Sequence, residues 1–303
     1  MYQALKPSRS TFVPIRHLDY HVLEWGTRRE GESPLVLMHG WMDVSASWQF
    51  MVDALQRDRW IIAADWRGFG LTRNAAQAPD NYWFPDYFAD LDGLLDHFSP
   101  GAPVDLVGHS MGANVVMFYA GIRPDRVQKL VNLEGFGLPQ TRPAQAPERY
   151  GKWLDEIKLL HEGKMSLRAY DSLDGVARRL QKTNPRLAED KARWLAQHWA
   201  ARNDEGQWEI LGDPAHKVVS AHLYQVEESL AVFRRITAPT LAVTASDDSL
   251  SSWWRGNYRM PEFLERMKAV PDLRHGQISD AGHMLHHDQP GALASMIEDF
   301  LYS

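Results

Sequence analysis

Short apolar runs alternate with amphipathic segments through the first 137 residues of the chain. Apolar runs rich in branched side chains predict strands, whereas apolar residues at helical spacing predict helices. Strands separated by helices imply a mostly parallel central sheet that is covered by helices on both faces. The expected strands lie within residues 12–25, 34–40, 59–68, 104–110 and 127–137, and the expected helices within 45–56, 87–98 and 111–122. The sequence therefore predicts an α/β protein.

This alternation stops at about residue 138 and resumes at about residue 236. Amphipathic stretches at 150–163, 187–201 and 217–233 predict that the intervening block is helical throughout. A helical block inserted between two strands of one sheet is most simply a lid, because ligands bind at the carboxyl edge of such sheets. We therefore divide the chain into a first core part at 1–137, a helical lid or cap at 138–235 and a second core part at 236–303.

Composition excludes several classes of protein. The chain has 303 residues, 33 basic and 39 acidic side chains and no cysteine. The lack of cysteine excludes disulfides, thiolate metal sites and a cysteine nucleophile. Basic residues are scattered, which gives no footprint for nucleic acid, and no stretch approaches the roughly 20 apolar residues of a membrane span. We expect a cytoplasmic protein whose partner is a small molecule.

The segment Gly108-His109-Ser110-Met111-Gly112 joins an expected strand to an expected helix. A serine in such a turn projects from the sheet edge, and the flanking glycines let neighbouring backbone approach closely. The alternative interpretation is a glycine-rich turn in which the serine has no role. The position between strand and helix favours Ser110 as a nucleophile.

A serine nucleophile needs a general base, and this architecture places the base after the last strand. His283, in the segment SDAGHMLHHDQP, has that position. His286, His287 and Asp288 superficially resemble a metal cluster, but adjacent histidines point in different directions and no second cluster completes a site. We therefore predict that His283 is the base and that the protein binds neither a metal nor a cofactor.

The base must in turn be oriented by an acid, for which three carboxylates compete. Asp247 and Asp248 follow the expected strand that ends in LAVTAS, and Glu134 ends the strand LVNLE. We favour Asp248, with Asp247 solvated or capping the next helix. Glu134 and Asp247 remain the alternative acids.

Acyl transfer also needs rigid donors for the developing oxyanion. In a nucleophile elbow one donor is the backbone N–H of the next residue, which is Met111. The second is expected from the loop His39-Gly40-Trp41, where the glycine permits a sharp turn and places the Trp41 amide opposite. The predicted oxyanion hole therefore consists of the Trp41 and Met111 amides.

At these positions the sequence resembles the α/β-hydrolase superfamily. The motifs occur in the family's order across 10–137 and 236–303: LMHGWMD, DWRGFG, GHSMG, the carboxylates after TAS, and DAGHMLHHDQP. The His-Gly-Trp loop with Ser-Met at the elbow is similar to bacterial ester hydrolases, in which amides at the positions of Trp41 and Met111 form the oxyanion hole. HGWMDVSASW with VNLEGFGLP is similar to the serine hydrolase-like branch. Dehalogenases and epoxide hydrolases of this fold carry Asp at the elbow, so Ser110 argues against both chemistries.

These features predict a carboxylesterase-like serine hydrolase that cleaves the ester of a small, apolar substrate through an acyl-enzyme. The same residues serve hydrolysis of a lactone, a thioester or a C–C bond, and a weakly active ligand-binding member of the fold is a further alternative. Six side chains of the expected lid are candidates for the pocket: Trp153, Met165, Tyr170, Trp194, His198 and Trp199.

Overall fold

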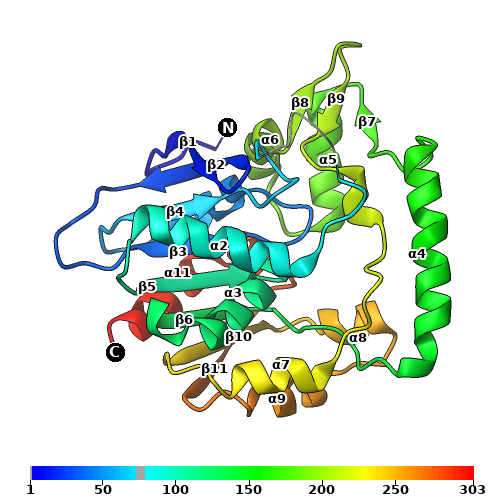
Figure 1. The fold of residues 1–303 in the computed structure, drawn as a ribbon. Coiled ribbons are helices and arrows are strands. Elements are labelled where there is room, and N and C mark those ends of the chain that lie inside the picture. Colours follow the sequence, from blue (N-terminus) through cyan, green and yellow to red (C-terminus); the bar gives the residue numbers. More distant parts are fainter. Residues whose placement is uncertain (1, 73–78) are drawn as a thin grey trace.

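The computed structural model describes residues 2–72 and 79–303, and its centre is an eight-stranded sheet (Figure 1). The strands are β1 (Arg9–Ile15), β2 (Leu18–Trp25), β3 (Leu35–Met38), β4 (Ile61–Ala64), β5 (Val104–His109), β6 (Val127–Leu133), β10 (Thr240–Ala245) and β11 (Leu273–Ile278). They are ordered β1-β2-β4-β3-β5-β6-β10-β11. Strand β2 is antiparallel to both β1 and β4, and every later pair is parallel. The expectation of a mostly parallel sheet is confirmed.

Helices cover the two faces of this sheet, as the alternation predicted. The core helices are α1 (Gln49–Ala54), α2 (Phe84–Phe98), α3 (Met111–Ile122), α8 (Ser249–Trp254), α9 (Met260–Met267), α10 (Leu285–Asp288) and α11 (Pro290–Leu301), with the 3₁₀ turns η1 (Ser45–Trp48) and η2 (Pro124–Arg126). In Figure 1, α2 and α3 cross in front of the sheet and α11 lies behind it. Successive residues of β3 alternate between the two apolar cores, because side chains of a strand point to opposite faces.

The sequence predicted that the segment between β6 and β10 is helical throughout, and the structure shows that this prediction is wrong. It contains η3 (Pro143–Gln145), α4 (Ala146–His161), α5 (Leu173–Thr183), α6 (Glu189–Trp199), η4 (Pro214–Lys217) and α7 (Val226–Phe233). It also contains a small sheet made of β7 (Ala169–Tyr170), β8 (Ala200–Arg202) and β9 (Trp208–Ile210). A tight turn joins β8 to β9, with Gly206 in the left-handed region at φ 80°. The helix expected at 217–233 is shorter than predicted, because α7 covers only Val226–Phe233.

Helix α7 packs on the core although it lies inside the expected insertion. The ring of Phe233 lies 5.9 Å from that of Phe118 in α3. A Cβ atom at Gly121 of α3 would lie 2.2 Å from the carbonyl oxygen of Val232, so the glycine permits this close approach. The core therefore resumes at α7, earlier than the predicted limit at residue 235.

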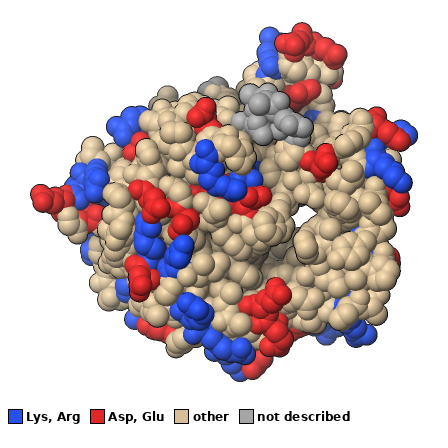
Figure 2. Space-filling model, viewed as in Figure 1, with Lys and Arg blue, Asp and Glu red and all other residues tan. Residues whose placement is uncertain are grey.

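Helix α4 stands at the edge of the molecule (Figure 1). None of its residues is buried, and Tyr150 and Leu154 are each about half exposed. In the space-filling view, an opening separates the core from the part of the molecule that contains α4 (Figure 2). None of the helices in the described residues is long and apolar enough to cross a bilayer.

Candidate active site

Ser110 occupies the turn between β5 and α3 in a strained backbone conformation, with φ 53° and ψ −115°. Its N–H donates to the carbonyl oxygen of Leu133, at 2.8 Å, which ties the turn to the end of β6. A Cβ atom at Gly108 would lie 2.5 Å from the carbonyl oxygen of Gly112, and one at Gly112 would lie 2.3 Å from that of Met38. Both glycines of the motif are therefore required sterically.

His283 follows β11 and meets a carboxylate through its Nδ1 atom. The distance from Nδ1 to Oε2 of Glu134 is 3.0 Å. The Trp253 ring and the imidazole pack nearly perpendicular to each other, with centroids 4.2 Å apart, and Nε2 of His109 donates to the carbonyl oxygen of His283 at 2.7 Å. Burial lowers the pKa of His283 to about 3. Since an ionised Glu134 can only accept, Nδ1 carries the proton and Nε2 keeps its lone pair.

Glu134 is held at the carboxyl end of β6 by its own backbone and by its side chain. The residue has φ 54°, and its N–H donates to the carbonyl oxygen of Val243 at 3.1 Å. Its Oε1 atom accepts the N–H of Ala245 at 2.8 Å. Burial raises the pKa of Glu134 to about 7, an effect that the Ala245 hydrogen bond opposes and the nearby carboxylates of Asp247 and Asp248 strengthen.

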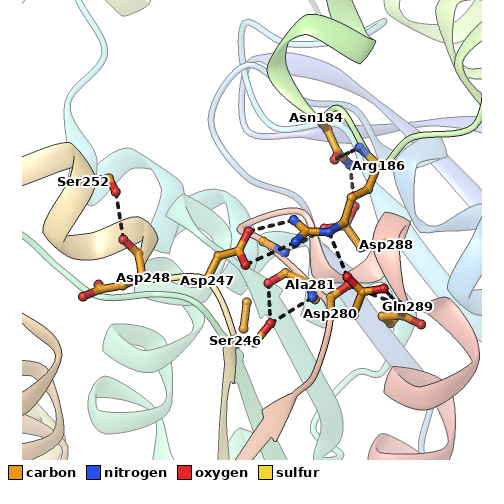
Figure 3. A network of polar contacts seen from close by, with 12 residues as sticks. Asn184, Arg186, Ser246, Asp247, Asp248, Ser252, Asp280, Ala281, Asp288 and Gln289 are labelled. Carbon is orange, nitrogen blue, oxygen red and sulfur yellow. Dashed lines mark hydrogen bonds and ion pairs between the residues drawn. The ribbon is translucent and has the colours of Figure 1, made fainter.

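Asp248 does not reach His283, which corrects the favoured sequence assignment of the acid. Its Oδ1 atom accepts the N–H of Ser251 at 2.9 Å, so the side chain caps α8. The same hydrogen bonding from Ser251 lowers the pKa of Asp248. In Figure 3 Asp248 lies on the α8 side of the loop, with its carbonyl oxygen toward Ser252.

Asp247 is engaged by the inserted segment and not by the histidine. Its carboxylate binds the guanidinium of Arg186 with distances of 2.7 and 3.2 Å, and Arg186 also lies 3.4 Å from Oδ1 of Asp280 (Figure 3). Asp247 therefore links the loop after β10 to the inserted segment, while Glu134, the other alternative acid, is the carboxylate beside His283. The expected capping role belongs to Asp248.

The loop after β3 lies against the nucleophile turn, as the oxyanion prediction requires. A Cβ atom at Gly40 would lie 3.1 Å from the Cβ atom of Ser110. Met111 is the first residue of α3, where a helix has no preceding carbonyl to accept the N–H. Trp41 lines the cavity above Ser110 and is about half exposed. The geometry is compatible with donation by both amides, whose role remains a prediction.

Ser110 and His283 open into one cavity of about 580 Å³. Its lining is mostly apolar and comes from the core and the inserted segment: Trp41, Met42, Leu167, Tyr170, Leu180, Leu187, Trp199, Ile210, Trp253 and Met284. Of the candidate lid residues, Tyr170 and Trp199 line the cavity. Trp194 instead packs against Tyr2 and Phe50 of the core, at ring distances of 5.3 and 5.7 Å.

A different hollow, of about 600 Å³, lies at the amino ends of β3, β4 and β5. Arg28, Glu32, Trp60 and Phe98 are among its lining residues. Catalytic groups of parallel sheets gather at the carboxyl ends of the strands. The cavity that contains Ser110 is therefore the candidate active site.

Asp43, His109 and His286 are the described residues that could hold a metal ion, because one ligand atom of each lies within 4.8 Å of the others. All three are buried, and Nε2 of His286 lies 3.9 Å from Oδ2 of Asp43. Burial raises the pKa of Asp43 to about 6. These three residues are far apart in the sequence, so no short ligand spacing indicated a metal site. The cluster considered from sequence shares only His286 with this one, and its Asp288 accepts the N–H of Gly282 at 2.8 Å.

Comparison with known proteins identifies the family. A sequence model of the alpha/beta hydrolase fold matches residues 33–290, which is most of the chain. The chain therefore belongs to the alpha/beta hydrolase fold family. The resemblance seen in the motifs is confirmed, as is the expectation of an enzyme of this class.

Individual relatives agree with this placement. The chain is 26% identical over 277 residues to a serine hydrolase-like protein from Danio rerio, covering 88% of this chain and 81% of that protein. It is 25% identical over 224 residues to a probable serine hydrolase from Drosophila melanogaster, covering 72% and 66%. A thioesterase domain from the curacin biosynthetic pathway superposes with a TM-score of 0.82 at 21% identity, covering 96% and 99%. That structural likeness shows the shared fold.

Proposed function

We propose that the protein is a serine hydrolase that cleaves the carboxylic ester of a small, largely apolar substrate through an acyl-enzyme. The observation that carries the proposal is the hydrogen-bonding contact between His283 Nδ1 and Glu134, 3.0 Å long, beside the cavity that contains the strained Ser110. A nucleophile, a base and an acid that orients the base are the parts of a catalytic triad. Here the acid is glutamate.

In this mechanism Nε2 of His283 takes the hydroxyl proton as Ser110 Oγ attacks the substrate carbonyl carbon. The amides of Trp41 and Met111 stabilise the oxyanion, and Glu134 stabilises the imidazolium. The C–O bond to the alcohol then breaks as His283 returns the proton to the leaving oxygen. A water molecule, deprotonated by the same nitrogen, hydrolyses the acyl-enzyme and regenerates Ser110.

The pH dependence of kcat/KM should report the Glu134 carboxyl. Burial raises the pKa of Glu134 to about 7, so the carboxylate form is lost as pH falls through that value. A protonated Glu134 no longer stabilises the imidazolium, whereas the pKa of His283, lowered to about 3, keeps the ring itself neutral. We expect kcat/KM to be flat above about pH 8 and to fall about tenfold per unit below about pH 6. A flat profile down to about pH 5 would contradict this assignment.

Covalent labelling tests the proposed nucleophile directly. A fluorophosphonate should modify one serine, located by peptide mass spectrometry at Ser110, and the label should be absent from Ser110→Ala. His283→Ala should label far more slowly, because the hydroxyl then lacks its base. Labelling of Ser110→Ala at the wild-type rate would rule the proposal out. An unreactive Ser110 combined with tight ligand binding would favour the low-turnover alternative.

The bond that is cleaved is a separate question from the triad. Ester, lactone, thioester and C–C substrates can all be attacked by the same serine, and the cavity selects among them. A panel of such substrates with varied acyl length, each assayed with wild-type protein and Ser110→Ala, separates these activities. We expect the highest Ser110-dependent kcat/KM with esters.

A further inference from the structure

Three cationic side chains line the wall that the inserted segment contributes to the catalytic cavity. They are Arg168 in the loop before β7, Arg179 in α5 and Lys217 at the end of η4. Among the described lining residues the carboxylates are limited to Asp43, which is buried at the core side. The mouth of a largely apolar cavity is therefore positive.

Neighbouring groups hold these cations at the mouth without neutralising them. Nζ of Lys217 donates to the carbonyl oxygen of Ser166 at 2.9 Å, and Arg179 donates to the hydroxyl of Thr183. The guanidinium of Arg168 lies 5.3 Å from the centre of the Tyr170 ring.

No carboxylate of the described residues pairs with any of these three cations, whereas the nearby Arg186 is paired with Asp247 and Asp280. An arginine keeps several of its five N–H donors available when one is used, and an ammonium group has three donors. The three cations are therefore free to bind an anion.

The positive surface continues outward from the cavity. An adjoining hollow of about 300 Å³ shares Arg168 and Arg179 with it and adds Arg178 and Lys182, against the single carboxylate of Asp171. The chain as a whole carries more acidic than basic residues, 39 against 33. Positive charge concentrated at a cleft of an otherwise acidic molecule raises the local concentration of anions.

We propose that the substrate is an anionic ester, whose carboxylate or phosphate group binds Arg168, Arg179 and Lys217 while its apolar part fills the cavity toward Ser110. This inference rests on the proposed function and specifies its substrate class. Guanidinium groups bind carboxylate and phosphate in a bidentate manner, and the lysine adds a point charge. The apolar lining between the cations and Ser110 suits an aliphatic or aromatic spacer.

Two matched pairs of substrates test the charge and identify its source. One pair is an aryl octanoate and the aryl hemi-ester of the eight-carbon dicarboxylic acid, which differ by a terminal carboxylate. The other pair is the octanoate ester of 1,4-butanediol monophosphate and the octanoate ester of 1,4-butanediol, which differ by a phosphate group. We expect the anionic member of at least one pair to have a KM about tenfold lower, and 0.5 M salt to reduce that preference.

The variant Arg168→Gln/Arg179→Gln/Lys217→Gln should remove the preference, measured as the ratio of kcat/KM between the anionic and neutral members of a pair. The ratio corrects for any general effect of the substitutions on folding or turnover. Arg235→Gln is the matched control, because Arg235 is exposed, follows α7 and lies outside the cavity lining. This control should keep the wild-type ratio.

Binding to Ser110→Ala separates this inference from the proposed mechanism. Calorimetry with the unreacted esters of both pairs should show, without turnover, the same preference for the anion that the KM values show. Equal or weaker binding of the anionic member of both pairs overturns the inference, as does a preference unchanged in the triple variant. Loss of Ser110-dependent hydrolysis with the binding preference intact would instead count against the proposed serine chemistry.

Discussion

Ser110→Ala is expected to lower kcat for ester hydrolysis by about 10⁴-fold to 10⁶-fold, because the attacking oxygen is lost while the rest of the site stays. Alanine keeps the Cβ atom, so the strained backbone at φ 53° is no less compatible with the new residue than with serine. The oxyanion donors and the cavity also remain. The measurement is steady-state hydrolysis of an aryl ester by purified protein, with burst kinetics to detect the acyl-enzyme in the wild type.

A matched serine substitution controls for preparation and folding. Ser8 is exposed near the amino terminus, far in sequence from every proposed catalytic group, and Ser8→Ala should retain the wild-type kcat. Thermal unfolding of both variants should resemble that of the wild type. Full activity of Ser110→Ala toward simple aryl esters would show that the proposed mechanism is wrong.

Glu134→Gln should lower kcat by about 10³-fold to 10⁴-fold while leaving KM nearly unchanged. The amide oxygen of glutamine can still accept the N–H of Ala245, as Oε1 of Glu134 does at 2.8 Å. The amide NH₂ group then faces Nδ1 of His283 as a donor. This arrangement moves the imidazole proton to Nε2, the nitrogen that must accept the Ser110 proton.

Asp248→Asn provides the control that separates the two candidate acids. Asparagine caps helices about as well as aspartate, so α8 should keep its first turn. We expect kcat within about twofold of the wild type, because Asp248 hydrogen-bonds to Ser251 and has no contact with His283 in this structure. Severe loss in Asp248→Asn together with an active Glu134→Gln would reverse the assignment of the acid.

The central sheet and the nucleophile turn were predictable because their signals are local. A short apolar run followed by Gly108, Ser110 and Gly112 specifies a strand, a tight turn and a helix within a few residues. The contacts that require the glycines occur within the motif for Gly108 and with the end of the adjacent strand β3 for Gly112. Local chemistry and global fold agree there, so pattern alone was sufficient.

The acid was harder to predict because its assignment depends on reach between neighbouring strands. Glu134 and Asp248 follow β6 and β10, which pair directly, so both carboxylates start near the same edge of the sheet. The left-handed backbone at Glu134 and the capping bond made by Asp248 decide which one meets His283. The signal available in the sequence was that Gly135 and Gly137 follow Glu134. This pattern indicates a turn, but it does not give the direction of the Glu134 side chain.

The small sheet in the inserted segment was missed for another reason. Its strands are two or three residues long, which is too short for a period-two pattern. The turn chemistry Asn203-Asp204-Glu205-Gly206 was the better signal, because Gly206 adopts positive φ and Asn203 accepts its N–H at 3.0 Å. The helical periodicity of the flanking stretches at 187–201 and 217–233 led to the prediction of helix instead of these strands.

The position of Glu134 also bears on how such an enzyme can be remodelled. Ser110 and Glu134 both precede the inserted segment and His283 follows it, so the chain between Gly137 and α7 supplies cavity wall without any proposed catalytic group. A chimera that exchanges this stretch with that of a relative would keep the reaction and change the selection of substrates. Contacts between this stretch and the core must be rebuilt in such a graft, among them those of Arg186 with Asp247 and of the indole N–H of Trp199 with Asp43.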